Sequence, residues 1–137
     1  MDRSGTCLCG KVKFTATQIN PEFHACHCSQ CRRWSGGPGL SVDAGGVSFS
    51  DASTLATFDS SEWAERGFCT ACGSGLFYRL KATDQYMISM GTLEDQSGLT
   101  LASEIYIDEK PDGYDFAGKH SRLTGEEFLA SVGQPSG

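Results

Sequence analysis

The cysteines of this 137-residue chain constrain its fold more than any other feature, because all seven fall into three short clusters. In chain order the clusters are Cys7-Leu8-Cys9, Cys26-His27-Cys28-Ser29-Gln30-Cys31 and Cys69-Thr70-Ala71-Cys72. Two cysteines separated by one residue point to the same side of an extended strand, and two separated by two residues can clamp an ion from a tight turn. The spacing therefore favours metal ligation.

The expected compartment and the odd number of cysteines both argue against disulfides. The chain has no apolar stretch of signal-peptide or membrane length, so we expect a cytoplasmic protein without a membrane partner, in a compartment where disulfides are uncommon. An odd number of cysteines also leaves one thiol over in any fully paired scheme. Eleven basic and seventeen acidic side chains give a formal charge of −6, which argues against a nucleic-acid partner.

The outer two clusters together supply four thiolates, the closed tetrahedral set of structural zinc. We assign this site to Cys7, Cys9, Cys69 and Cys72. A glycine follows the second cysteine of each pair, at Gly10 and Gly73, where the chain must turn and offer amides to sulfur.

The middle cluster has three cysteines and no fourth. Three protein ligands and an open position are typical of catalytic zinc, so Cys26, Cys28 and Cys31 are the candidate catalytic residues, and we expect two zinc ions per chain. Three thiolates leave the centre with a charge of −1, which favours a soft incoming thiolate over activation of water. A bound thiol would lose its proton and become reactive. The sequence therefore predicts a small thiol substrate.

Other schemes remain open at this point. An ordinary zinc ribbon would use Cys28 and Cys31 with Cys69 and Cys72, leave the other three cysteines idle and bind one metal ion. A redox role for the Cys69–Cys72 pair is less favoured, since no thioredoxin-like βαβ pattern surrounds it. Iron–sulfur ligation and metal storage or sensing are also chemically compatible with these cysteines.

Arg32 and Arg33 follow the third ligand of the middle cluster directly. They are our candidate substrate-binding residues, because guanidinium groups bind carboxylates, although a solvated surface pair explains them equally well. His27 lies between two ligands and should point away from the metal. We interpret His24 and His120 as structural.

The remaining pattern predicts one mostly β domain over residues 1–137, built of short antiparallel strands. Val12, Phe14 and Ala16 alternate with polar residues, and similar segments occur at 47–49, 76–80, 86–90 and 105–107. Thr124 and Glu127 form a capping box that predicts a C-terminal helix at about 125–132, with a stop at Gly133. Exposed sheet edges would allow a homodimer.

Three segments carry a specific resemblance to a known family: Gly5–Phe14, Cys26–Arg33 and Phe68–Phe77. They resemble the glutathione-dependent formaldehyde-activating enzyme (GFA) family, which includes the centromere protein V domain, and the similarity spans roughly residues 4–114. The resemblance implies a β-tent fold organised around zinc sites and a carbon–sulfur lyase that joins glutathione and formaldehyde as S-hydroxymethylglutathione. It also implies the same zinc partition, with Cys26, Cys28 and Cys31 on the catalytic metal.

Two functional hypotheses follow. The first is a zinc-dependent lyase that forms or cleaves the adduct of a small thiol, such as glutathione, with formaldehyde or another small aldehyde. The second is a non-catalytic, zinc-stabilised binding module for a protein or other partner, which the centromere-protein resemblance supports.

Overall fold

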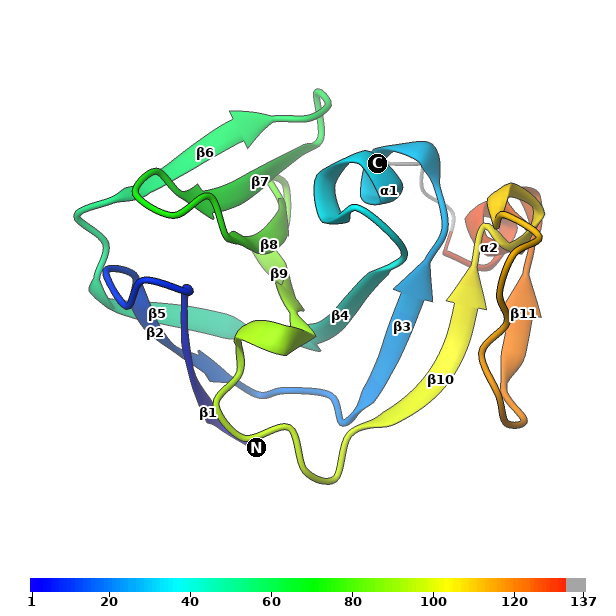
Figure 1. Cartoon of the computed structure of the whole chain (residues 1–137), viewed down its shortest axis with the longest axis horizontal. Coiled ribbons are helices and arrows are strands. Elements are labelled where there is room, and N and C mark those ends of the chain that lie inside the picture. The colour runs from blue at the N-terminus through cyan, green and yellow to red at the C-terminus, as the bar shows by residue number, and fades with distance from the viewer. Residues whose placement is uncertain (133–137) are drawn as a thin grey trace.

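The computed structural model describes residues 1–132, which form two β-sheets and several short helices (Figure 1). The first half of the chain contains β1 (Arg3–Thr6), β2 (Lys13–Thr17), β3 (Glu22–Cys26), α1 (Ser29–Ser35), β4 (Gly39–Ala44), β5 (Gly46–Asp51), β6 (Leu55–Asp59) and β7 (Ala64–Cys69). The second half contains β8 (Gly75–Leu80), β9 (Gln85–Ser89), η1 (Met90–Thr92), β10 (Thr100–Ile105), η2 (Ile107–Glu109), β11 (Ser121–Leu123) and α2 (Gly125–Val132). The mostly β prediction is confirmed.

The sheets differ in size and partly in strand direction. One has the order β1-β2-β5, and the other has the order β11-β10-β3-β4-β9-β8-β7-β6. Neighbouring strands of residues 1–132 pair antiparallel as predicted, except that β10 runs parallel to both β3 and β11. The antiparallel prediction is wrong for these pairs, because β10 joins β3 only after a long excursion of the chain rather than through a hairpin.

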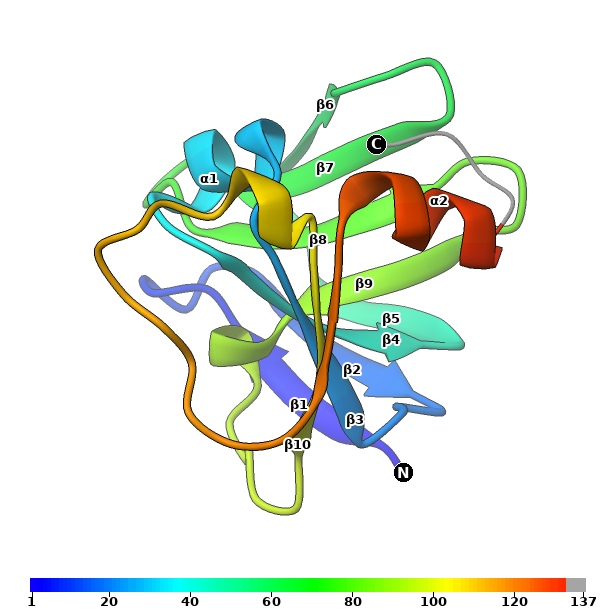
Figure 2. The ribbon, with the colours of Figure 1, turned by 90° about the vertical axis from the view of Figure 1, so that its right-hand side faces the viewer.

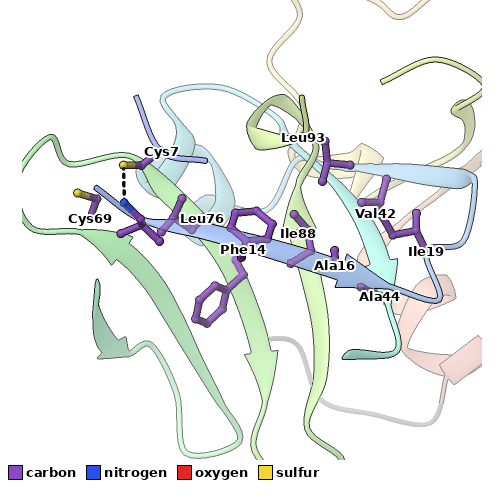
Figure 3. Packing of buried hydrophobic residues seen from close by; sticks show 12 residues of the cluster. Cys7, Phe14, Ala16, Ile19, Val42, Ala44, Cys69, Leu76, Ile88 and Leu93 are labelled. Carbon is purple, nitrogen blue, oxygen red and sulfur yellow. Dashed lines mark hydrogen bonds between the residues drawn. The ribbon is translucent and has the colours of Figure 1, made fainter. Parts of the chain in front are cut away.

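The hydrophobic core lies on one face of the strands that the alternation predicted. Val12, Phe14 and Ala16 are at most 3% exposed, and they pack with Val42 of β4 and Ile88 of β9. Figure 3 shows Cys7 and Cys69 at one end of this packed cluster. The core therefore continues directly into the first candidate metal site.

The opposite face of the larger sheet lines a cavity. Because side chains alternate along a strand, the residues between the core positions of β3, β4 and β9 point the other way. Cys26, Asp43 and Met87 are such residues, and all three line the cavity. One sheet thus carries the core on one face and the candidate functional surface on the other.

The C-terminal helix α2 begins and proceeds as predicted. The Thr124 hydroxyl accepts a hydrogen bond from the Glu127 amide at 3.1 Å, and the Glu127 carboxylate accepts one from the Thr124 amide at 2.8 Å. The Phe128 ring packs against Tyr106, with 6.1 Å between ring centroids. The stop predicted at Gly133 lies outside the described residues.

Two local features differ from the predictions. The strand expected at 105–107 ends at Ile105, because Tyr106 adopts a left-handed conformation with φ of 56° and η2 follows. Helix α1 was not predicted; it begins after Cys28, whose sulfur caps it by accepting a hydrogen bond from the Cys31 amide. Within residues 1–132, neither helix has the length and apolar character needed to cross a membrane.

Gly67 of β7 offers a direct test of the packing. An added Cβ would lie 2.2 Å from the Phe77 ring, so Gly67→Ala forces the ring and the strand apart. We expect the free energy of unfolding to fall by about 1–3 kcal/mol, measured by urea denaturation. The matched control is Gly91→Ala, since an added Cβ there meets no atom within 4 Å. Equal unfolding midpoints for the two variants would contradict this account of the core.

Candidate functional site

Four cysteines meet where the β1–β2 turn approaches the β7–β8 turn. Cys7 and Cys9 come from the first turn, Cys69 ends β7, and Cys72 lies in the turn that follows it. Their sulfur atoms all lie within 4.8 Å of one another, with 3.6 Å between Cys7 and Cys9 and 3.8 Å between Cys9 and Cys69. In a tetrahedral zinc centre with Zn–S bonds of about 2.3 Å, sulfur atoms are about 3.8 Å apart. The donor set therefore fits zinc.

The Cys7–Cys9 pair lies in a turn, not in the extended strand that its spacing suggested, whereas Cys69 lies in a strand. The Cys7–Cys9 pair lies just beyond β1, and the chain reverses at Gly10, where φ is +81°. Gly73 reverses the chain after the second pair with φ of +79°, and its amide donates to the Cys69 carbonyl at 2.7 Å. Both glycines have the turning role that their positions in the sequence predicted.

Neutral donors surround the four sulfurs. The Ser74 hydroxyl lies 3.2 Å from the Cys72 sulfur and, with backbone amides, lowers the pKa of that thiol to about 5. The Thr54 hydroxyl, also at 3.2 Å, lowers the pKa of Cys69. These hydrogen bonds favour the thiolate, which is the form that binds a metal ion.

Three cysteines meet at the junction of β3 and α1. Cys26 ends β3, Cys28 caps α1, and Cys31 lies in the helix; their sulfurs also lie within 4.8 Å of one another. Hydrogen bonds with Cys26 and Cys31 lower the pKa of Cys28, while hydrogen bonds with Cys28 and Cys31 raise the pKa of Cys26. Among residues 1–132 the sulfurs thus group as four and three, and Cys28 and Cys31 do not join Cys69 and Cys72 in a ribbon.

The two groups differ in what they face. All three cysteines of the smaller group line one end of a cavity of about 500 Å³, whereas none of the four does. Phe128 and Val132 of α2 also line the cavity, together with Leu80 and Met87 of the larger sheet. In the view of Figure 2, α2 lies in front of β9. The three-cysteine group is therefore the one that a small molecule can reach.

A buried arginine borders the same end of the cavity. Arg66 of β7 is 5% exposed, and its Nη2 lies 3.8 Å from the Cys31 sulfur. Its guanidinium lies over the rings of Trp34 and Tyr78, at 5.8 and 5.0 Å from their centroids. Sequence reasoning did not identify Arg66. The sequence feature that could have indicated its burial is its position two residues after Ala64, on the same face of a strand.

The predicted substrate-binding residues lie elsewhere. Arg32 donates from Nε to the His27 carbonyl at 3.0 Å, and Arg33 is exposed on α1. Both line a separate hollow of about 400 Å³, together with Gly36, Gly37, Pro111 and Tyr114. The structure thus places them beside the three-cysteine segment but outside the lining of its cavity.

A buried ionic cluster holds the segment between two of the ligands. His27 points away from the sulfurs, as expected, and its Nε2 lies 2.8 Å from Glu104 Oε1 on β10. His120 Nε2 and Arg122 Nε contact the other oxygen of Glu104 at 2.6 and 3.1 Å. Glu104 is 1% exposed and His27 is fully buried. The cluster therefore ties the Cys26–Cys28 segment to β10 and to the chain before and within β11.

Glu104 is ionised in this cluster. Burial by itself raises the pKa of Glu104, but hydrogen bonds from His120 and His27 outweigh the burial and leave the pKa below its usual value. Sequence reasoning assigned no role to Glu104, because its partners lie 77 residues before it and 16 residues after it.

Replacing Glu104 by glutamine tests this cluster. We expect Glu104→Gln to lower the free energy of unfolding at pH 7 by about 1–3 kcal/mol, because the buried donors lose a charged acceptor. A lowered native pKa contributes stability above the unfolded pKa, and that contribution is lost as the pH falls through the native pKa. The difference from the parent protein, measured by urea denaturation at each pH, should therefore shrink below about pH 4.5. The exposed Glu62→Gln is the control, and a difference that grows in acid would contradict the assignment.

Comparisons with known proteins identify a family and several relatives of this chain. The family model for the glutathione-dependent formaldehyde-activating enzyme, GFA, matches residues 2–109. An uncharacterised lyase of Schizosaccharomyces pombe is 32% identical over 130 residues, which cover 93% of this chain and 95% of the relative. A protein of Halomonas elongata, provisionally named a glutathione-dependent formaldehyde-activating enzyme, is 32% identical over 87 residues, or 53% of each chain.

A crystal structure of a Rhodobacter sphaeroides protein has a similar fold, with a TM-score of 0.58 at 20% identity. The likeness covers 89% of this chain and 99% of that one. The family match includes all seven cysteines, Arg66 and Glu104, and it ends before His120 and α2. The chain belongs to the glutathione-dependent formaldehyde-activating enzyme family.

Proposed function

We propose that this protein is a zinc-dependent carbon–sulfur lyase. It binds a small thiol such as glutathione at Cys26, Cys28 and Cys31, and it forms or cleaves the adduct of that thiol with formaldehyde or another small aldehyde. The observation that carries the proposal is the contrast between the two cysteine groups, since only the three-cysteine group lines the cavity. The family membership and the lyase name of the fission-yeast relative support it.

The donor sets decide what each site would do. Zinc bound by the three cysteines supplies a coordination position for the substrate sulfur and lowers the pKa of its thiol. Cys7, Cys9, Cys69 and Cys72 fill all four positions of a second zinc, which would fasten two turns that lie about 60 residues apart in sequence. The first site is therefore proposed as catalytic and the second as structural.

The cavity suits the proposed substrates. Its volume of about 500 Å³ falls within the range of about 300–1,000 Å³ that is usual for small-molecule sites. Trp34 and Tyr78 supply apolar walls next to the cysteines, which exclude water and hold the two reactants together. Since thiols add to formaldehyde without help, proximity and a deprotonated sulfur are sufficient contributions from the protein.

Two further parts of the proposal concern the surroundings of the site. Arg32 and Arg33 remain proposed contacts for substrate carboxylates, but we expect them to contribute less than groups in the cavity wall because their hollow is separate.

Seven free cysteines and a thiol substrate both suit a reducing compartment, and on this ground we propose a cytoplasmic location.

The cobalt-substituted protein tests the proposal. We expect two metal ions per chain by elemental analysis, and a change in the cobalt absorption bands that saturates with millimolar glutathione. Cys31→Ser should keep the fold, bind one metal ion tightly and lose the glutathione response. Cys72→Ser is the matched control, because it weakens the structural site and should lower thermal stability.

Unchanged cobalt bands in millimolar glutathione would contradict the proposal. A single metal ion per chain in the protein without mutations would also contradict it. In either case the binding-module hypothesis would take its place. The circular dichroism spectrum of each variant checks that a lost response does not reflect a lost fold.

A further inference from the structure

Arg66 is a buried cation without a carboxylate partner. Among residues 1–132, no aspartate or glutamate lies within ion-pair distance of its guanidinium, although the side chain is 5% exposed. Buried charges are normally paired, because removing them from water is costly. Within the described part of the chain, its one side-chain hydrogen-bond contact is the Cys31 sulfur at 3.8 Å. The guanidinium therefore has donors left for an anionic group in the cavity.

The surrounding chain fixes the direction of this cation. Arg66 and Tyr78 are register partners on β7 and β8, so the Tyr78 ring lies beside the guanidinium. The Trp34 ring, from helix α1, also lies close to the guanidinium. The ring has room there because Gly75 of β8 has no side chain, and an added Cβ would lie 2.5 Å from the indole nitrogen. Two rings from separate elements thus hold the guanidinium at the end of the cavity that Cys31 also lines.

The distance to Cys31 limits which substrate atom Arg66 can meet. A contact of 3.8 Å to one of the three ligand sulfurs places the guanidinium at the edge of the site where the substrate sulfur would bind. In glutathione the carboxyl group of the cysteinyl residue is part of a peptide bond, so both free carboxylates lie many bonds from the sulfur. In a thiol–aldehyde adduct the oxygen is attached to the carbon next to the sulfur. The adduct oxygen is therefore the group within reach.

That oxygen gains negative charge during the reaction. When the thiolate adds to the aldehyde, a carbon–sulfur bond forms, the π pair of the carbonyl moves to oxygen, and the resulting alkoxide takes a proton from water. Cleavage runs through the same alkoxide in reverse. A fixed donor beside a developing oxyanion stabilises the transition state without reorganisation.

We propose that Arg66 binds the aldehyde oxygen and stabilises the alkoxide formed when the thiol adds to it. This inference rests on the proposed function and adds a catalytic residue to it. It also defines the second substrate as a small carbonyl compound whose oxygen points toward β7 and the guanidinium of Arg66.

Arg66→Met and Arg66→Lys test the proposal, with Arg79→Met as the matched control, because Arg79 is also partly buried but pairs with Glu65 and Asp84 outside the cavity. Three quantities are measured: metal ions per chain, glutathione affinity from the cobalt bands, and the exchange rate between free glutathione and its formaldehyde adduct by NMR. For Arg66→Met we expect two metal ions and a glutathione affinity within about threefold of the parent. The enzyme-dependent exchange rate at saturating glutathione should fall about 10²–10³-fold.

Arg66→Lys should fall between the parent and Arg66→Met, since lysine keeps the charge but not the fork of donors. Loss of the metal from both Arg66 variants would overturn the proposal, because it would show that the arginine only balances the thiolates. A glutathione affinity weakened more than about tenfold at an unchanged saturated rate would overturn it in favour of a carboxylate contact. An unchanged rate with an intact cobalt response overturns this inference alone, whereas no cobalt response in the parent overturns the proposed function as well.

Discussion

Repulsion between clustered thiolates is the constraint on which the rest of the structure depends. The sulfurs of each group lie within 4.8 Å of one another, and several negative charges at that spacing require protons or a cation among them. The opposed pKa shifts of Cys26 and Cys28 express this constraint, because one thiol holds its proton and stabilises the thiolate of the other. Metal binding releases such protons, so the turns that gather the sulfurs and the affinity for metal are coupled.

The larger sheet places the hydrophobic core on one face and the cavity with the three-cysteine group on the other. Its strands alternate between core residues such as Val42 and cavity residues such as Asp43, so one register fixes both faces. The closed cysteine group adjoins the core, where Cys7 and Cys69 are buried. The open group lies at the end of β3 on the other face. A shift of register by one residue would exchange the two surfaces, and the buried core is what prevents it.

The sequence predicted best the features that local spacing determines. The cysteine pairs within each cluster, the turns at Gly10 and Gly73 and the capping box at Thr124 all depend on neighbours within a few residues. The grouping of Cys7 and Cys9 with Cys69 and Cys72 spans about 60 residues, and it was predicted because four thiolates complete a structural zinc site. Helix α1 escaped prediction because a cysteine sulfur caps it, which is not among the usual capping side chains.

The residues that surround the open site could not be predicted in the same way. Arg66 meets Cys31 across 35 residues of sequence, and Glu104 meets His27 across 77, so neither contact follows from spacing. The four-cysteine and three-cysteine groups also differ in the charges that surround them. Four thiolates on a dication give −2, and neutral hydroxyls and amides suffice around them. A dication held by three would carry −1, and in the three-cysteine group a buried guanidinium lies beside the sulfurs. Within the proposed function, that guanidinium would offset the negative charge that develops on the aldehyde oxygen.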